Sequence, residues 1–319
     1  MALEGPVLLV GVGGAGSRIM ADACLGIKSQ CALVSDDLGD LRGTYRSVLI
    51  SAKSWLNPTA YKLRYYAQGS TKRIRSLFHG FKTVVVVANL AGKCGSAIAP
   101  VVCKLAKEGS NCNTLISIVI MPFRFEKARV FQAAVSLKRV RESSDATVVI
   151  DNDSFLDNNP ESSVEECYQL TNPALAETIG LICKGQVSGG MSYLCSGNSA
   201  GGAEMSARDL VAMLYPNNSS GRDKSPMLYV IGGKKVTLGL LNSLVNTLQS
   251  MYRDEINSGA TVVISNSDNA NVHLLASFGQ TTRFDDYDPL SQIIPGKNVL
   301  DWEELDCSPE IEMSITNIE

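Results

Sequence analysis

A group of glycines near the start of the chain has the spacing of a phosphate-binding loop. Gly11, Gly13, Gly14 and Gly16 follow a short apolar run, and Ser17 comes directly after them. Glycines let a backbone approach a phosphate closely, and the start of a helix offers free N–H groups and a positive dipole. The same pattern also fits an ordinary tight turn between a strand and a helix. The sequence therefore predicts either a nucleotide phosphate site or a structural turn here.

An acidic residue at a later strand end raises the possibility of a dinucleotide. Asp36 lies 20 residues after Gly16, at the end of the second apolar run. In a dinucleotide-binding enzyme an acid at this place binds a ribose hydroxyl. An NAD-dependent oxidoreductase is therefore one hypothesis, although no catalytic histidine, Tyr-Lys pair or redox cysteine pair accompanies the motif. The two histidines, His79 and His273, are interpreted as structural.

A second segment of small residues, Ala91–Ala97, also lies between a strand pattern and a helix pattern. It contains Gly92, Lys93, Cys94, Gly95 and Ser96. Two such loops suggest a triphosphate clasped between two helix N-termini, whereas an ordinary loop packed with small residues is the alternative. The lysine could pair with a phosphate or block one. The cysteine is interpreted as a replacement for threonine or serine rather than as a nucleophile.

Alternating strand and helix patterns must position these loops. Apolar runs predict strands at Val7–Val10, Cys31–Val34, Ser47–Ile50, Thr83–Asn89, Thr114–Met121 and Thr147–Ile150. Helical patterns between them cover about residues 17–25, 98–106 and 130–141. This alternation predicts an α/β fold with a doubly wound parallel sheet, and continuous β-branched runs fit strands that are buried on both faces.

The second half of the chain predicts a helix followed by a smaller α/β set. The helix covers Pro173–Lys184, and later strands are expected at Met227–Ile231, Thr261–Ser265 and His273–Phe278. The predicted organisation is a nucleotide-binding domain over residues 1–166, a core helix over 167–185, a smaller α/β domain over 186–284 and an acidic tail over 285–319.

Composition narrows the classes of protein. Hydrophobic residues make up 45% of the chain and the net charge is −3, which indicates a globular protein that does not bind nucleic acid through bulk positive charge. No apolar run reaches the length of a membrane span, and the first residues lack the basic start of a secretory signal. Nine scattered cysteines argue against a disulfide framework and fit a reducing, cytoplasmic location.

Four motifs, in order along the chain, resemble the tubulin/FtsZ superfamily of polymerising GTPases. They are Gly11–Gly16, Ala99–Val102, Pro122–Glu126 with Arg129, and the strand that ends at Ile150 and is followed by Asp151, Asn152 and Asp153. The resemblance covers about residues 6–280 and implies a site for GTP or GDP, with Mg²⁺ as a candidate ion. It implies that Glu126 and Arg129 contact ribose, that Asn152 joins the site and that Asn172 contacts guanine. A surface ion pair and a helix N-cap are the respective alternatives for Glu126–Arg129 and for Asn172.

The chain departs from this family at two places that matter for chemistry. The second loop of FtsZ is richer in glycine, whereas here Gly92 and Gly95 remain and Ser96 supplies the one hydroxyl. FtsZ also carries an NxDxxD loop whose acids position the attacking water in the next subunit's site, and Ser188–Tyr193 has neither aspartate.

The resemblance therefore implies an FtsZ/tubulin-like cytoskeletal protein that binds a guanine nucleotide, with weak or absent intrinsic hydrolysis. It would assemble with itself or with a paralogue that supplies the missing acids. The sequence offers no candidate catalytic residue or metal site, and a nucleotide-free scaffold of the same fold stays open as an alternative.

Overall fold

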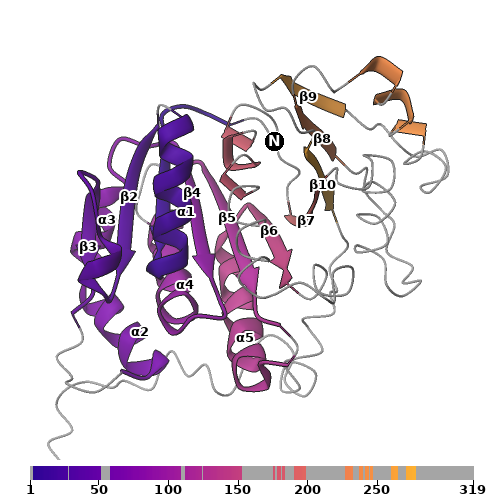
Figure 1. The fold of residues 1–319 in the computed structure, drawn as a ribbon. Coiled ribbons are helices and arrows are strands. Elements are labelled where there is room, and N and C mark those ends of the chain that lie inside the picture. The colour runs from indigo at the N-terminus through magenta and orange to yellow at the C-terminus, as the bar shows by residue number, and fades with distance from the viewer. Residues whose placement is uncertain are drawn as a thin grey trace, which may run out of the picture.

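A computed structural model gives the arrangement of the chain (Figure 1). It describes residues 3–27, 29–51, 58–108, 112–123 and 125–152, parts of 175–183 and 237–246, and strands over 190–198, 227–232, 260–264 and 271–277. In this part of the chain, the strands form one sheet in the order β3-β2-β1-β4-β5-β6-β7-β10-β8-β9. None of the helices described here is long and apolar enough to span a bilayer.

The first six strands are parallel neighbours. They are β1 (Val7–Val12), β2 (Gln30–Ser35), β3 (Arg46–Leu49), β4 (Thr83–Asn89), β5 (Thr114–Met121) and β6 (Ala146–Asp151). The prediction of a doubly wound parallel sheet is therefore confirmed. The predicted bounds of β4 and β5 agree with the structure to the residue.

The sheet continues beyond β6 with mixed directions. Strand β7 (Gly190–Asn198) runs parallel to β6, and β10 (Asn271–Ser277) runs antiparallel to both β7 and β8 (Met227–Gly232). Strand β9 (Ala260–Ile264) is parallel to β8. The strands expected in the second half of the chain are thus present within one or two residues of their predicted bounds. The division into domains stays a prediction, and the predicted tail lies outside the described residues.

Helices cover both faces of the parallel part of the sheet. They are α1 (Gly13–Gly26), α2 (Ala60–Gly69), α3 (Thr71–Leu77), α4 (Lys93–Lys107) and α5 (Lys127–Ser143), together with the short 3-10 helix η1 (Leu38–Asp40). Buried residues of α1 and of 175–182 pack on one face, and those of α2 to α5 pack on the other.

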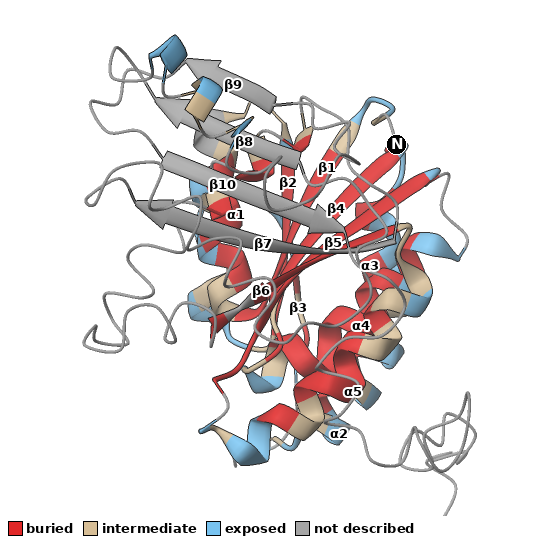
Figure 2. Cartoon of the chain, turned by 90° about the vertical axis from the view of Figure 1, so that its right-hand side faces the viewer, coloured by how far each residue is buried: buried red, intermediate tan, exposed pale blue. Residues whose placement is uncertain are grey.

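Successive residues of each central strand point to opposite faces, which explains the continuous apolar runs. In β1, Leu8 and Val10 pack with α4, whereas Leu9 packs with Ile19 and Met20 of α1. Because helices cover both faces, both sets of side chains are buried, as the red strands between the helices show (Figure 2).

Both helices that follow the glycine-rich segments begin earlier than predicted. α1 starts at Gly13 rather than at Ser17, and α4 starts at Lys93 rather than at Ile98. The prediction treated both glycine-rich segments as loops because glycine is a poor helix former. The structure instead uses a glycine for close packing in the first turn of α4, since a Cβ on Gly95 would lie 2.0 Å from the carbonyl oxygen of Asn89.

Candidate functional site

The two glycine-rich segments meet at the carboxyl ends of β1 and β4, which are adjacent parallel strands. Gly13 has a φ of +70°, and a Cβ built on it would lie 3.2 Å from the Cβ of Cys94 and 3.4 Å from the backbone nitrogen of Gly95. Strand order reverses between β1 and β4, because β1 is followed in the sheet by β2 on one side and β4 on the other. Ligands of open α/β sheets bind at such a switch point.

Two other glycines of the first segment are required by packing. A Cβ on Gly11 would lie 2.6 Å from the carbonyl oxygen of Gly16, and one on Gly16 would lie 2.4 Å from that of Val87. These contacts hold the start of α1 against β1 and β4. Gly11 and Gly16 therefore serve the fold whether or not a ligand binds, whereas Gly13 and Gly14 lie toward the second segment and the loop after β2.

The helices that begin at this junction lack side-chain caps. Val12 and Gly92 are the N-caps of α1 and α4, and neither helix has a capping hydrogen bond or an acid in its first turn among the described residues. By contrast, Thr59 caps α2 by accepting a hydrogen bond from the backbone nitrogen of Lys62 at 3.3 Å. The first amides of α1 and α4 can therefore donate to an anion.

Two of the predicted site residues carry buried polar atoms with no hydrogen-bond partner. Ser17 and Asn152 are each 2% exposed, and neither Ser17 Oγ nor Asn152 Oδ1 meets a partner in the described part of the chain. Ser17 lies in the second turn of α1, and Asn152 directly follows β6. Because burying an unpaired polar atom costs free energy, such atoms indicate a partner outside the described residues.

The second segment is organised by a residue that the sequence analysis did not single out. Asn89 Oδ1 accepts a hydrogen bond from the backbone nitrogen of Ala91 at 2.9 Å, which fixes the turn before α4. An asparagine before small residues is a known signal for such a turn. Lys93 is exposed at the first position of the helix, and buried Ser96 donates its hydroxyl to the carbonyl oxygen of Lys93 at 3.1 Å.

The surroundings of Cys94 favour the protonated form of its thiol. Burial raises its pKa well above the usual value, and the nearby Asp36 carboxylate raises it further. Ser35 Oγ lies 3.8 Å from Cys94 Sγ. The interpretation of Cys94 as a replacement for a hydroxyl residue stays a prediction. Asp36 lies beside the second segment.

A third element contributes an acid that the sequence analysis missed. Asp40, in η1 after β2, accepts a hydrogen bond from Ser35 Oγ at 2.7 Å. Its Oδ1 atom lies 2.9 Å from the position of a Cβ on Gly14. Nothing in the sequence pattern distinguishes Asp40 from other loop acids, because this contact joins residues that are separated by β2.

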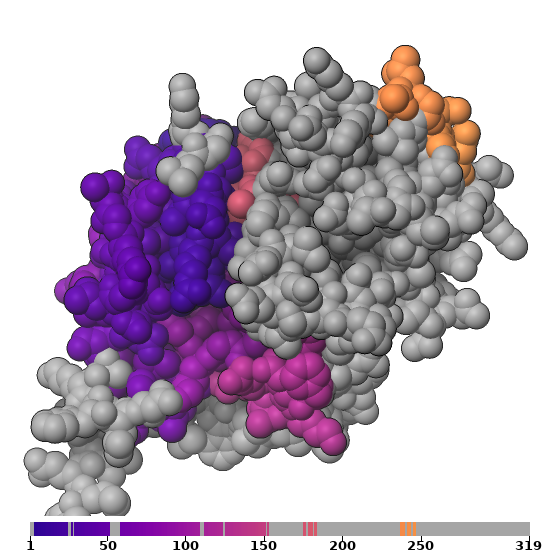
Figure 3. Space-filling view, viewed as in Figure 1, coloured from indigo at the N-terminus to yellow at the C-terminus, as the bar shows by residue number. Residues whose placement is uncertain are grey.

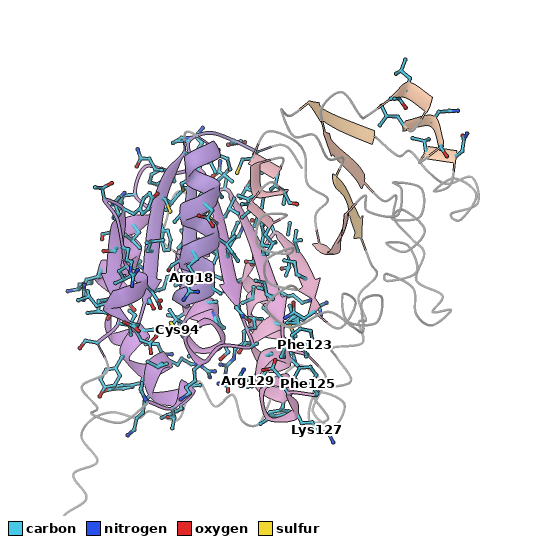
Figure 4. All side chains as sticks on the ribbon, viewed as in Figure 1. Arg18, Cys94, Phe123, Phe125, Lys127 and Arg129 are labelled. Carbon is cyan, nitrogen blue, oxygen red and sulfur yellow. The ribbon has the colours of Figure 1, made fainter. Side chains whose placement is uncertain are left out.

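Glu126 and Arg129 form an ion pair at the start of α5. Arg129 Nη1 donates to Glu126 Oε1 at 2.5 Å, and Glu126 Oε2 accepts from the backbone nitrogen of Phe123 at 3.2 Å. The Arg129 side chain is 62% exposed, so it remains accessible. The rings of Phe123 and Phe125 stack beside this pair with centroids 5.0 Å apart (Figure 4).

The structure brings some of the predicted site residues together and leaves one outside its described part. Gly13, Gly14, Cys94 and Gly95 come together at the switch point, and Glu126 and Asn152 lie after β5 and β6 at the same edge of the sheet. Asn172 lies outside the described residues. In the described part of the chain, no group of three or more His, Cys, Asp and Glu side chains could hold a metal ion.

Part of the stretch compared with the FtsZ catalytic loop lies on a strand. Residues Gly190–Tyr193 belong to β7. The chain has no aspartate or glutamate between Glu177 and Glu204. This part of the chain therefore supplies no carboxylate that could orient a water molecule.

A family model and the curated relatives both match this chain to tubulin and FtsZ proteins. Residues 44–160 match the model described as Tubulin/FtsZ family, GTPase domain. The chain is 33% identical over 113 residues to the cell division protein FtsZ 2 of Halobacterium salinarum, covering 35% of this chain and 28% of that protein. It is 26% identical over 184 residues to FtsZ 2 of Methanocaldococcus jannaschii, covering 55% and 48%. The chain therefore spans less than half the length of these two relatives.

Solved structures show the same fold over most of the chain. The empty FtsZ dimer of M. jannaschii superimposes with a TM-score of 0.68 at 22% identity, covering 89% of this chain and 92% of that one. A GTPγS-bound protofilament of CetZ2 from Haloferax volcanii gives 0.65 at 20% identity, covering 89% and 96%.

Proposed function

Because this chain is a member of the tubulin/FtsZ superfamily, we propose that it binds GTP or GDP at the carboxyl edge of β1 and β4. The observation that carries the proposal is the contact of Gly13 with Cys94 and Gly95, which brings two uncapped helix N-termini to one place. Phosphates would accept hydrogen bonds from these amides. The exposed Lys93 at the start of α4 and the exposed Arg18 in the second turn of α1 would add positive charge.

Several other residues would complete the nucleotide site. Ser17 Oγ and Asn152 Oδ1 are buried atoms that a bound ligand or its ordered water could satisfy. Glu126 and Arg129 would reach the ribose, and Asn172 is proposed for the base by resemblance. Mg²⁺ would be held chiefly by the phosphates, since it commonly binds with only one or two protein carboxylates.

We further propose that intrinsic GTP hydrolysis is weak or absent. The resemblance to FtsZ implies that GTP hydrolysis needs acidic residues supplied by the next subunit. In the corresponding stretch, this chain has no aspartate or glutamate between residues 177 and 204. Water orientation contributes much of the rate of phosphoryl transfer, so a polymer of identical subunits would lack that contribution. A paralogue with the acidic loop would restore it at this chain's nucleotide.

We propose assembly into filaments because of what the similar proteins are. The CetZ2 neighbour is a protofilament, and the curated relatives are named cell division proteins. The chain would then act as a filament subunit in the cytoplasm, alone or with such a paralogue. A nucleotide-free scaffold remains the second candidate, because the second segment retains few glycines and the Asp40 carboxylate lies against Gly14.

Calorimetric titration with GTP, GDP and NAD tests the central proposal. Micromolar binding of guanine nucleotides, with no binding of NAD, is expected. Binding of NAD alone would support an oxidoreductase, and the absence of all binding would support the scaffold. Phosphate release and pelleting, measured with and without an FtsZ that carries the acidic loop, then separate assembly from hydrolysis.

A further inference from the structure

The Asp40 carboxylate is held by a hydrogen bond at one oxygen, and its other oxygen lies against α1. Oδ2 accepts the hydroxyl of Ser35 at 2.7 Å, and Ser35 is fully buried at the end of β2. Ser35 Oγ also accepts a hydrogen bond from the backbone nitrogen of Asp37 at 3.2 Å, so this anchor is held in place. Oδ1 is directed at α1 and lies 2.9 Å from the Cβ position of Gly14.

Gly14 is the second residue of α1, at the positive end of the helix dipole. A carboxylate at this place interacts favourably with the helix, although no described amide of α1 donates a hydrogen bond to it. A phosphate cradled by the same glycines would meet this negative charge at short range. At a half-buried position the repulsion is only partly screened by solvent.

We propose that Asp40 is a resident carboxylate that competes with the nucleotide phosphates for the start of α1, and that it lowers the affinity for a triphosphate more than for a diphosphate. This inference rests on the proposed nucleotide site, and in it Asp40 sets the affinity of that site for GTP and GDP. The difference between the nucleotides follows from charge, because the triphosphate carries one more negative charge into the same field.

The other charges near the junction do not cancel this effect. Asp36 lies beside the Cys94 thiol and adds negative charge. Asp37 is exposed, and its carboxylate accepts the backbone N–H of Gly39 at 2.8 Å. The cations Arg18, labelled in Figure 4, and Lys93 are both exposed, so solvent screens them more than it screens Asp40.

The test is titration of the full chain and of Asp40→Asn with GTP and with GDP, first in EDTA and then with Mg²⁺. Asparagine is nearly the same size and still accepts the Ser35 hydroxyl, so the loop is retained. In EDTA the variant is expected to bind GTP about tenfold more tightly and GDP about threefold more tightly. With Mg²⁺, the gain in affinity of the variant over the original chain should be smaller for both nucleotides, because the ion neutralises part of the phosphate charge.

Asp37→Asn is the matched control. It makes the same change of charge in the same loop, and asparagine preserves the cap on Gly39. Less than a twofold change in affinity is expected for it. Asp40→Glu retains the charge and should keep the low affinity of the original chain. Thermal unfolding without nucleotide checks that all variants are folded.

The outcomes separate this inference from the proposed function. Equal affinities for the original chain and Asp40→Asn, weaker binding by Asp40→Asn, or an equal gain for Asp37→Asn would each overturn the role of Asp40 and leave nucleotide binding intact. If none of the variants bound either nucleotide, the proposed function would fall and the inference with it. Binding by Asp40→Asn alone would support both.

Discussion

Gly16 of α1 lies so close to Val87 of β4 that a Cβ on the glycine would stand 2.4 Å from the Val87 carbonyl oxygen. That atom is backbone within the centre of the sheet, so it cannot move aside as a flexible side chain would. The first glycine segment therefore allows α1 to pack closely on the sheet, and it is also a candidate phosphate-binding loop.

Gly16→Ala is expected to lower the free energy of unfolding by about 2–3 kcal/mol, because the added methyl forces α1 away from the sheet. A thermal melt should show a fall of roughly 5–10 °C. Gly69→Ala is the control, since a Cβ at the end of α2 meets nothing within 4 Å. It should leave the melting temperature unchanged or raise it slightly. Equal effects of the two changes would contradict this account.

Ser17→Ala separates stability from ligand binding. The hydroxyl is buried and unpartnered in the described structure, so its removal should leave the unfolding free energy unchanged or raise it by up to about 1 kcal/mol. Nucleotide affinity should fall about three- to tenfold if the hydroxyl contacts the ligand. Ser136→Ala gives the comparison, because Ser136 Oγ donates to the Ser96 carbonyl oxygen at 2.8 Å and its loss should cost about 1 kcal/mol. A destabilised Ser17→Ala with unchanged affinity would refute this prediction.

Arg129→Gln tests the proposed ribose contact. The ion pair with Glu126 is largely exposed on the arginine side, so its loss should change stability by less than about 1 kcal/mol. Guanine-nucleotide affinity should nevertheless fall about fivefold, because a charge-assisted contact to the ligand is removed. Lys127→Gln, an exposed neighbour on the same helix, makes the same change of charge and should leave affinity unaltered. Matching losses in both variants would indicate a general effect of charge.

The cysteines should differ in reactivity. The hydrogen bond from the Cys31 thiol lowers the pKa of Cys24, whereas burial raises the pKa of Cys103 to about 11. A lower pKa means more thiolate at pH 7.5, so among the described cysteines iodoacetamide should modify Cys24 first and leave Cys103 unmodified in the folded protein. Mass spectrometry of digested samples over time measures this order. Cys31→Ala should slow the modification of Cys24.

Much of the fold could be predicted because its signals are local. The β-branched runs at Thr83–Asn89 and Thr114–Met121 identified β4 and β5 to the residue. The helix starts at Gly13 and Lys93 could not be found in this way, since glycine propensity argues for a loop. Tertiary packing overrides that propensity, because α1 and α4 can approach the sheet only where no side chain intervenes.

The candidate site divides in the same manner. Sequence alone determined which segments carry glycines at the ends of strands and which order of motifs indicates the family. It also showed that Ser188–Tyr193 lacks the two aspartates of the FtsZ catalytic loop. Only the tertiary structure decided that Gly13 lies against Cys94, that Asp40 lies against Gly14 and that the polar atoms of Ser17 and Asn152 are buried without partners.

The physical reason is the range over which each relationship acts. Strand and helix patterns depend on periodicity within a few residues, so the printed sequence contains them. The contacts at the start of α1 join residues that follow β1, β2 and β4 and lie up to 81 positions apart, from Gly13 to Cys94. Sheet order and register bring them together, and those follow from the burial of apolar surface by the whole chain.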